Sequence, residues 1–124
     1  MRFVNPIIFV RDIAASKAFY TDVIGLPIEQ DHGDFVLFSG HFGIHAGTAL
    51  IRTVWGTENA GEPASFGGQN LLLYFEDDDI DASFLRLKDR VRLIHPLDRQ
   101  AWGQRVFRFY DPDGHAVEIG EPMT

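Results

Sequence analysis

Two residues, His45 and Glu118, are the strongest candidates for acid–base or metal chemistry in this sequence. Each lies in a segment that we expect to be a β-strand, where side chains alternate between two faces. The residues beside them on the same face are small: Gly43 and Gly47 for His45, and Ala116 and Gly120 for Glu118. Small neighbours leave space around a polar side chain. This favours a cavity lining, although an outer surface facing water stays open as the alternative.

Other chemistries find little support in the residue pattern. His41 and His45 are four residues apart, which along a strand is about 13 Å and too far for one metal ion. The chain has no cysteine, and no serine stands in a nucleophile motif. Asp111-Pro112-Asp113-Gly114 is typical of a tight turn. We expect this turn to join two strands and to take no direct part in chemistry.

The aromatic residues are numerous, with eleven Phe, three Tyr and two Trp. Most must fill a core, because aromatic side chains supply much of the buried area of a small domain. Trp55 and Trp102 differ, since each precedes a glycine in an expected loop. They could stack on a planar ligand or cover the ends of a sheet. Phe38 and Phe109 could line a cleft or fill the core.

The composition indicates a single domain of 124 residues, of which 45% are apolar, with a net charge of −7. Lysine and arginine form no cluster, which argues against nucleic acid as a partner. No stretch is long and apolar enough to span a membrane. The N-terminus lacks the apolar core of a signal peptide, and together with the absence of cysteine this leads us to expect a cytoplasmic protein.

The order strand, helix and three strands occurs twice along the chain. Asp12–Ser16 and Asp79–Ser83 match at four of five positions, and each segment opens the helix of its half. We expect module one over 1–50, a connector over 51–68 and module two over 69–124. The expected helices are 12–23 and 79–90. The expected strands are 3–10, 27–32, 34–39, 42–47, 70–75, 91–95, 104–110 and 115–120.

Both halves resemble the vicinal oxygen chelate superfamily, which includes glyoxalase I, bleomycin resistance proteins, fosfomycin resistance proteins and extradiol dioxygenases. The first half carries Phe9–Ile13, Phe19-Tyr20 and Gly25-Leu26; the second carries Trp102–Arg105, Phe109–His115 and Glu118. The resemblance implies an α+β fold of two βαβββ modules, which form a curved sheet around a cleft. It also implies a homodimer, because short members commonly pair.

The resemblance further implies four positions where enzymes of the superfamily hold a metal: Asn5, His45, Asn70 and Glu118. Asparagine replaces the usual histidine at two of them, and neutral amides are poor ligands for zinc or iron. We therefore expect no cofactor. A divalent ion (Zn, Ni, Mn or Fe) on His45 and Glu118 is the alternative.

The function that we expect is metal-independent binding and sequestration of a small planar or cationic molecule, as in bleomycin resistance proteins. The expected ligand-binding residues are Asn5, Phe38, Trp55, Asn70, Trp102 and Phe109. One alternative is a metal-dependent lyase or isomerase of the glyoxalase type, which would use His45 and Glu118. The other is a metal-free enzyme in which these two residues act as an acid–base pair. The sequence leaves the identity of the ligand open.

Overall fold

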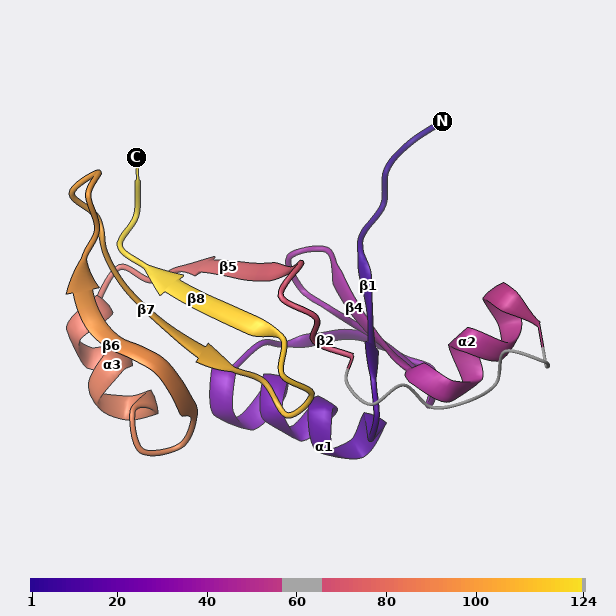
Figure 1. Ribbon diagram of the computed structural model, residues 1–124. Helices are drawn as coiled ribbons and strands as arrows, with labels where there is room; N and C mark the ends of the chain where they lie inside the picture. The colour runs from indigo at the N-terminus through magenta and orange to yellow at the C-terminus, as the bar shows by residue number, and fades with distance from the viewer. Residues whose placement is uncertain (57–65, 124) are drawn as a thin grey trace. The chain divides into compact units, whose positions relative to one another are not determined.

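A computed structural model describes residues 1–56 and 66–123, and the chain divides into two compact units over 1–66 and 67–124 (Figure 1). Each unit holds one four-stranded mixed sheet and follows the order expected for a βαβββ module. The α+β class and the repeated module are thus confirmed. No helix of the described ranges is long and apolar enough to cross a membrane.

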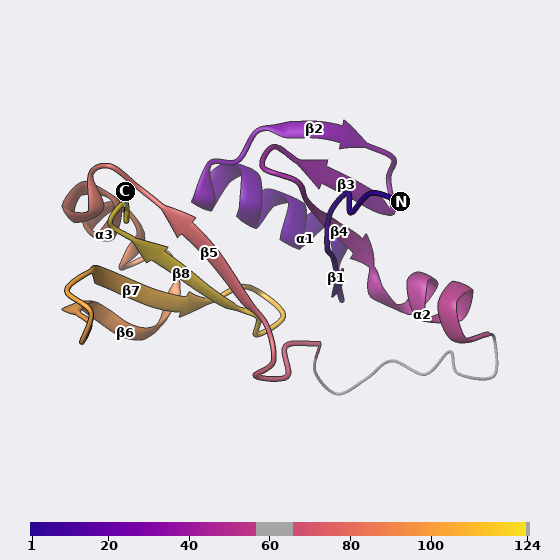
Figure 2. The ribbon, with the colours of Figure 1, turned by 90° about the horizontal axis from the view of Figure 1, so that it is seen from above.

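The sheet of the first unit has the strand order β1-β4-β3-β2 (Figure 2). β1 runs parallel to β4, and the other neighbours are antiparallel. The elements are β1 (Ile7–Val10), α1 (Ile13–Ala18), the π-helix η1 (Phe19–Ile24), β2 (Ile28–Asp31), β3 (Phe35–Phe38), β4 (Phe42–Ala46) and α2 (Gly47–Trp55). The core of this unit lies where Tyr20 packs against Phe38 and Phe42, with ring centroids 5.6 and 5.0 Å away.

The repeated sequence begins both module helices in the same way. Asp12 accepts a hydrogen bond from the backbone N–H of Ala15 at 3.1 Å, and Asp79 does so from Ala82 at 3.1 Å. These bonds satisfy N–H groups that a helix start leaves without an intrahelical partner. The first helix ends at Gly25, as expected, because its φ of 93° suits glycine.

Helix α2 (Gly47–Trp55) corrects the expectation of a connector from residue 51 and of a strand through residue 47. No side chain caps its N-terminus at Ala46, so the usual start signal is absent. Gly56, with a φ of 94°, ends it. The rest of the expected connector, over 57–65, lies outside the described residues.

The sheet of the second unit has the matching order β5-β8-β7-β6. The elements are β5 (Leu72–Glu76), α3 (Ile80–Leu87), β6 (Arg92–Arg99), β7 (Arg105–Tyr110) and β8 (Ala116–Gly120). β6 continues past the expected end at residue 95, although it contains Pro96. It is an edge strand whose register shifts between His95 and Asp98, and such irregular edges tolerate proline.

Helix α3 covers one face of the second sheet. Phe84 of α3 meets Phe107 of β7 with ring centroids 5.2 Å apart, and Phe107 stacks on Phe109 at 5.8 Å. Because side chains alternate along a strand, Arg108 points to the opposite face. We call this side the open face of the second sheet. The face of the first sheet that carries His45 is likewise turned away from its buried core, and we call it the open face of the first sheet.

Candidate functional site

His45 lies on β4 between two aromatic neighbours. It is opposite Phe9 on β1 and opposite Phe35 on β3, whose ring centroid is 6.1 Å from that of the imidazole. Nδ1 of His45 donates to the carbonyl of Ala46 at 3.0 Å. The imidazole is half-buried. His45 therefore forms part of an aromatic surface on the open face of the first sheet.

The space directly beside the glycines that flank His45 is occupied by other side chains. A Cβ on Gly43 would lie 2.7 Å from Cε1 of Phe35 and 3.4 Å from Nδ2 of Asn5. A Cβ on Gly47, the first residue of α2, would lie 2.5 Å from Cζ of Phe66. The rings of Phe35 and Phe66 thus occupy the space directly beside these two glycines, and a cavity around His45 stays a prediction.

Trp55 extends the aromatic surface beyond the strands. It is the last residue of α2 and remains 56% exposed. Its ring centroid lies 6.0 Å from that of Phe9, which in turn lies 6.4 Å from Phe66. Together, Phe35, His45, Phe9 and Trp55 follow one another across β3, β4, β1 and the end of α2, and we call them the aromatic row.

Of the two other candidates of the first unit, Asn5 lies close to the Phe35 end of the row, and Phe38 lies in the core. Asn5 precedes β1 and donates from its amide to the carbonyl of Pro6 at 2.9 Å. Phe38 is fully buried between Tyr20 and Phe42. Phe38 therefore fills the core, the second of the two roles that its sequence left open.

Glu118 lies on β8 in the second unit, on the open face of the sheet. It is only 5% exposed, and its Oε1 accepts a hydrogen bond from Nε of Arg108 at 2.6 Å. The two residues are opposite each other in the antiparallel pair β7–β8. The space at Gly120 is again filled, since a Cβ there would lie 2.5 Å from Nε2 of Gln104. Glu118 is thus an ion-paired carboxylate.

Arg108 connects Glu118 to the edge strand. Its Nη1 donates to Nε2 of His95 at 3.0 Å and to Oε1 of Gln100 at 3.3 Å. Nδ1 of His95 donates in turn to the carbonyl of Pro96 at 2.8 Å. Our sequence reasoning did not select Arg108. A signal was available, because Arg108 is the only charge among apolar residues over 106–110.

The donor set implied by the resemblance suits a divalent metal poorly. A cationic guanidinium neutralises Glu118 at short range and would compete with a metal for its oxygens. Asn70 is an exposed amide ahead of β5, and Asn5 uses its amide on the backbone. His45 is the one remaining good donor of the four.

A second group of possible metal ligands lies in the turn between β7 and β8. Asp111, Asp113 and His115 each offer one ligand atom, and these atoms lie within 4.8 Å of one another. The same groups already serve the turn. Oδ1 of Asp111 accepts from the backbone N–H groups of Asp113 and His115, both at 2.9 Å. The spacing could accommodate an ion, which would have to share these atoms with the turn.

The aromatic candidates of the second unit have different surroundings. Phe109 is fully buried in the core, stacked on Phe107. Trp102 lies between β6 and β7, is 58% exposed, and donates from Nε1 to Oε1 of Gln104 at 2.9 Å. Gln104 also donates to the hydroxyl of Tyr74 at 2.9 Å. The Tyr74 hydroxyl donates to Glu76 at 2.6 Å, and this bond raises the pKa of Tyr74.

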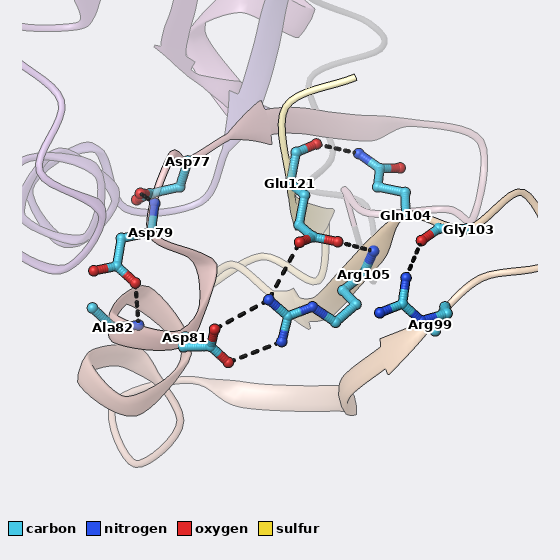
Figure 3. A network of polar contacts seen from close by, with 9 residues as sticks. All are labelled: Asp77, Asp79, Asp81, Ala82, Arg99, Gly103, Gln104, Arg105 and Glu121. Atoms are coloured by element: carbon cyan, nitrogen blue, oxygen red, sulfur yellow. Dashed lines mark hydrogen bonds and ion pairs between the residues drawn. The ribbon is translucent and has the colours of Figure 1, made fainter. Parts of the chain in front are cut away.

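A charged network joins α3 to β7 and to the chain after β8 (Figure 3). The guanidinium of Arg105 binds Asp81 through two hydrogen bonds of 3.0 and 3.1 Å, and Glu121 through one of 3.2 Å. The hydrogen bond from Arg105 lowers the pKa of Asp81. The backbone N–H of Arg105 and then its side chain lower the pKa of Glu121. Asp77 has a lowered pKa chiefly because the Ser83 hydroxyl donates to it. These acidic residues stabilise the helix start and its contact with β7.

Comparison with known proteins gives one family. A family model described as a glyoxalase-like domain matches residues 3–124. The uncharacterized protein YraH of Bacillus subtilis is 31% identical over 127 residues, which cover 96% of this chain and 97% of YraH. A protein of unknown function from Agrobacterium tumefaciens has a crystal structure with a TM-score of 0.93 and 58% identity, covering 99% of this chain and 95% of that one. A glyoxalase/bleomycin resistance protein/dioxygenase from Nocardioides has a TM-score of 0.74 at 23% identity, covering 98% of this chain and 83% of that one.

Proposed function

Because this chain belongs to the glyoxalase-like family, whose model spans residues 3–124, we propose that it binds a small planar molecule without a metal. The binding surface is the aromatic row on the open face of the first sheet. The protein would act by holding the molecule and keeping it from its target. Family membership alone leaves the activity open, since one fold carries many functions.

The aromatic row is the observation that supports this proposal. The rings of Phe9 and Phe35 flank His45 on neighbouring strands, and the ring of Trp55 continues the surface beside Phe9. All four rings are at least partly exposed. Flat ligands gain from stacking on such rings in addition to the area that they bury. The exposed indole is the largest of these platforms.

The charge of the protein favours a cationic ligand over an anionic one. The net charge is −7, which attracts cations to the surface. An aromatic ring also attracts a cation to its face, and tryptophan does so most strongly. A planar cation would benefit from both effects at Trp55.

Two features of the four positions where the resemblance implied metal ligands support binding without a metal. Arg108 holds Glu118 at 2.6 Å, and amides replace histidines at positions 5 and 70. In a glyoxalase-type lyase on His45 and Glu118, a metal would have to share the Glu118 carboxylate with Arg108. The proposal therefore places no chemical step on Glu118.

Fluorescence titration with 9-aminoacridine, which is planar and cationic at neutral pH, tests the proposal. The Trp102→Phe variant leaves Trp55 as the single indole, so quenching reports on the aromatic row. We expect saturable quenching. Trp55→Leu should weaken binding by about fivefold, corresponding to roughly 1 kcal/mol of lost stacking and cation–π interaction. Affinity should be unchanged by EDTA.

Val54→Ala is the matched control, because Val54 is the neighbouring exposed residue of α2 and is absent from the row. It should bind 9-aminoacridine like the parent protein. Cyclohexylammonium, which is cationic without being planar, should compete poorly. Near-stoichiometric retention of Ni, Zn, Mn or Fe that is lost in His45→Ala would overturn the proposal in favour of the metal-dependent lyase.

A further inference from the structure

Aromatic rings lie side by side across the full width of the first sheet. In the strand order β1-β4-β3-β2, Phe9 of β1 pairs with His45 of β4, and His45 pairs with Phe35 of β3. The backbone N–H of His32, the residue that follows β2, donates to the carbonyl of Phe35 at 2.8 Å. Residues that lie directly opposite each other in a sheet present their side chains on the same face. His32 therefore continues the aromatic row to the edge of the sheet.

The two imidazoles of this longer row are held in place by hydrogen bonds. The ring of His32 is nearly parallel to that of Phe35, with an interplanar angle of 13° and a centroid distance of 6.1 Å. Nε2 of His32 donates to Oε1 of Gln30 at 3.1 Å. Nδ1 of His45 is bound to the carbonyl of Ala46 in the same way. Side chains that are already ordered lose less entropy when a ligand binds.

The row is too long for a compact ligand to cover. Neighbouring strands lie about 4.8 Å apart, so the four positions from Phe9 to His32 span about 14 Å across the sheet. Trp55 adds a fifth ring, whose centroid is 6.0 Å from that of Phe9. His32 and Trp55, the two end members, are exposed, and the three rings between them are partly exposed. A ligand that contacts all five rings must therefore be elongated.

A negative charge lies at the His32 end of the row. Asp34 is exposed in the turn that joins His32 to β3. Among the described residues, its side chain has no hydrogen bond or ion pair. A carboxylate without a partner attracts a cationic group in a ligand. The charge of this turn thus favours one orientation of an elongated cation on the row.

We infer that the aromatic row, extended by His32, binds an elongated ligand whose aromatic rings are joined end to end and whose positive charge lies at the end next to Asp34. The inference rests on the proposed function and adds the shape and the orientation of the ligand. Each further ring contact adds stabilisation beyond the area that it buries, whereas the loss of translational and rotational freedom is incurred once. An elongated ligand therefore gains more from this surface than a compact one.

Two fluorescent ligands of different length test the inference. 9-Aminoacridine is compact. A bisbenzimidazole dye is elongated, with a phenol at one end and a cationic N-methylpiperazine at the other. We expect the bisbenzimidazole to bind nucleic-acid-free protein about tenfold more tightly than 9-aminoacridine does. His32→Asn should weaken bisbenzimidazole binding about fivefold and 9-aminoacridine binding less than about twofold. Trp55→Leu should weaken both, because both ligands contact that indole.

His41→Asn is the matched control, because His41 is an exposed histidine in the turn at the opposite end of β3 and lies outside the row. It should bind both ligands like the wild type. Asp34→Asn should weaken bisbenzimidazole binding about threefold at low salt, and salt should diminish this difference because it screens exposed charges.

The two ligands separate failure of this inference from failure of the proposed function. If 9-aminoacridine does not bind, or if Trp55→Leu leaves its affinity unchanged, the proposed function is wrong and the inference falls with it. If 9-aminoacridine binds through Trp55 but the bisbenzimidazole binds no more tightly, or loses no affinity in His32→Asn, the proposed function stands and the elongated ligand is ruled out.

Discussion

Nε of Arg108 lies 2.6 Å from Oε1 of Glu118, and the two side chains form an ion pair on the open face of the second sheet. The side chain of Glu118 is 6% exposed and that of Arg108 is 24% exposed, so water screens the pair only partly. Glu118 stands at a position where the resemblance implied a metal ligand. Here the guanidinium of Arg108 stabilises its carboxylate within the sheet.

The ion pair predicts a strong effect when one partner is removed. Arg108→Gln should lower the free energy of unfolding by about 3 kcal/mol, because it leaves a buried carboxylate without its cation. Glu118→Gln combined with Arg108→Gln should recover much of that loss. Urea denaturation of the wild type, both single variants and the double variant measures the coupling. Additive losses in the double variant would contradict it.

The repeated helix starts predict similar effects at two positions far apart in the chain. Asp12→Ala and Asp79→Ala should each lower the free energy of unfolding by about 1 kcal/mol, because each removes the side chain that caps a helix. Thermal unfolding monitored by circular dichroism provides the measurement. Asp12→Asn and Asp79→Asn are the matched controls, since asparagine also caps helices, and they should stay close to the wild type.

The network of Arg105 predicts a loss of stability in acid. Asp81 and Glu121 have lowered pKa values in the folded protein, so their contribution is present above their ordinary values near pH 4. It is lost as the pH falls through the lowered values. Arg105→Gln should therefore be less stable than the wild type at pH 6, and the difference should shrink as the pH drops below about 4. Urea midpoints of both proteins between pH 6 and pH 2.5 test this, and a constant difference would contradict it.

The neighbouring glycines at 67 and 68 predict a loss of stability for one alanine substitution and almost no change for the other. A Cβ on Gly67 would lie 2.2 Å from the backbone of Gly114, whereas one on Gly68 would meet nothing nearer than 3.7 Å. Gly67→Ala should lower the free energy of unfolding by roughly 1–3 kcal/mol, because the turn must shift. Gly68→Ala should stay within about 0.5 kcal/mol of the wild type. Chemical denaturation of the two variants provides the comparison.

Much of the fold could be predicted because its signals act over a few residues. The side chains of Asp12 and Asp79 each accept a hydrogen bond from the backbone N–H group three residues later. Gly25 ends the first helix, and Asp111 accepts a hydrogen bond from the backbone N–H of His115, four residues later in the turn. Such contacts need only the local chain, so residue type and spacing determine them. The order of strands and helices in each module followed from the same patterns. Helix α2 was missed because its start lacks a cap.

The site depended on contacts that no local pattern contains. The register of β7 against β8 places Arg108 opposite Glu118. Packing brings Phe35 over Gly43 and Gln104 over Gly120, so the space directly beside each glycine is filled. Phe38 and Phe109 are in the cores because their strand faces meet helices, whereas Trp55 remains exposed at the end of α2. The sequence thus determined which residues could do chemistry, and tertiary structure decided their partners, since register and packing join residues that are distant along the chain.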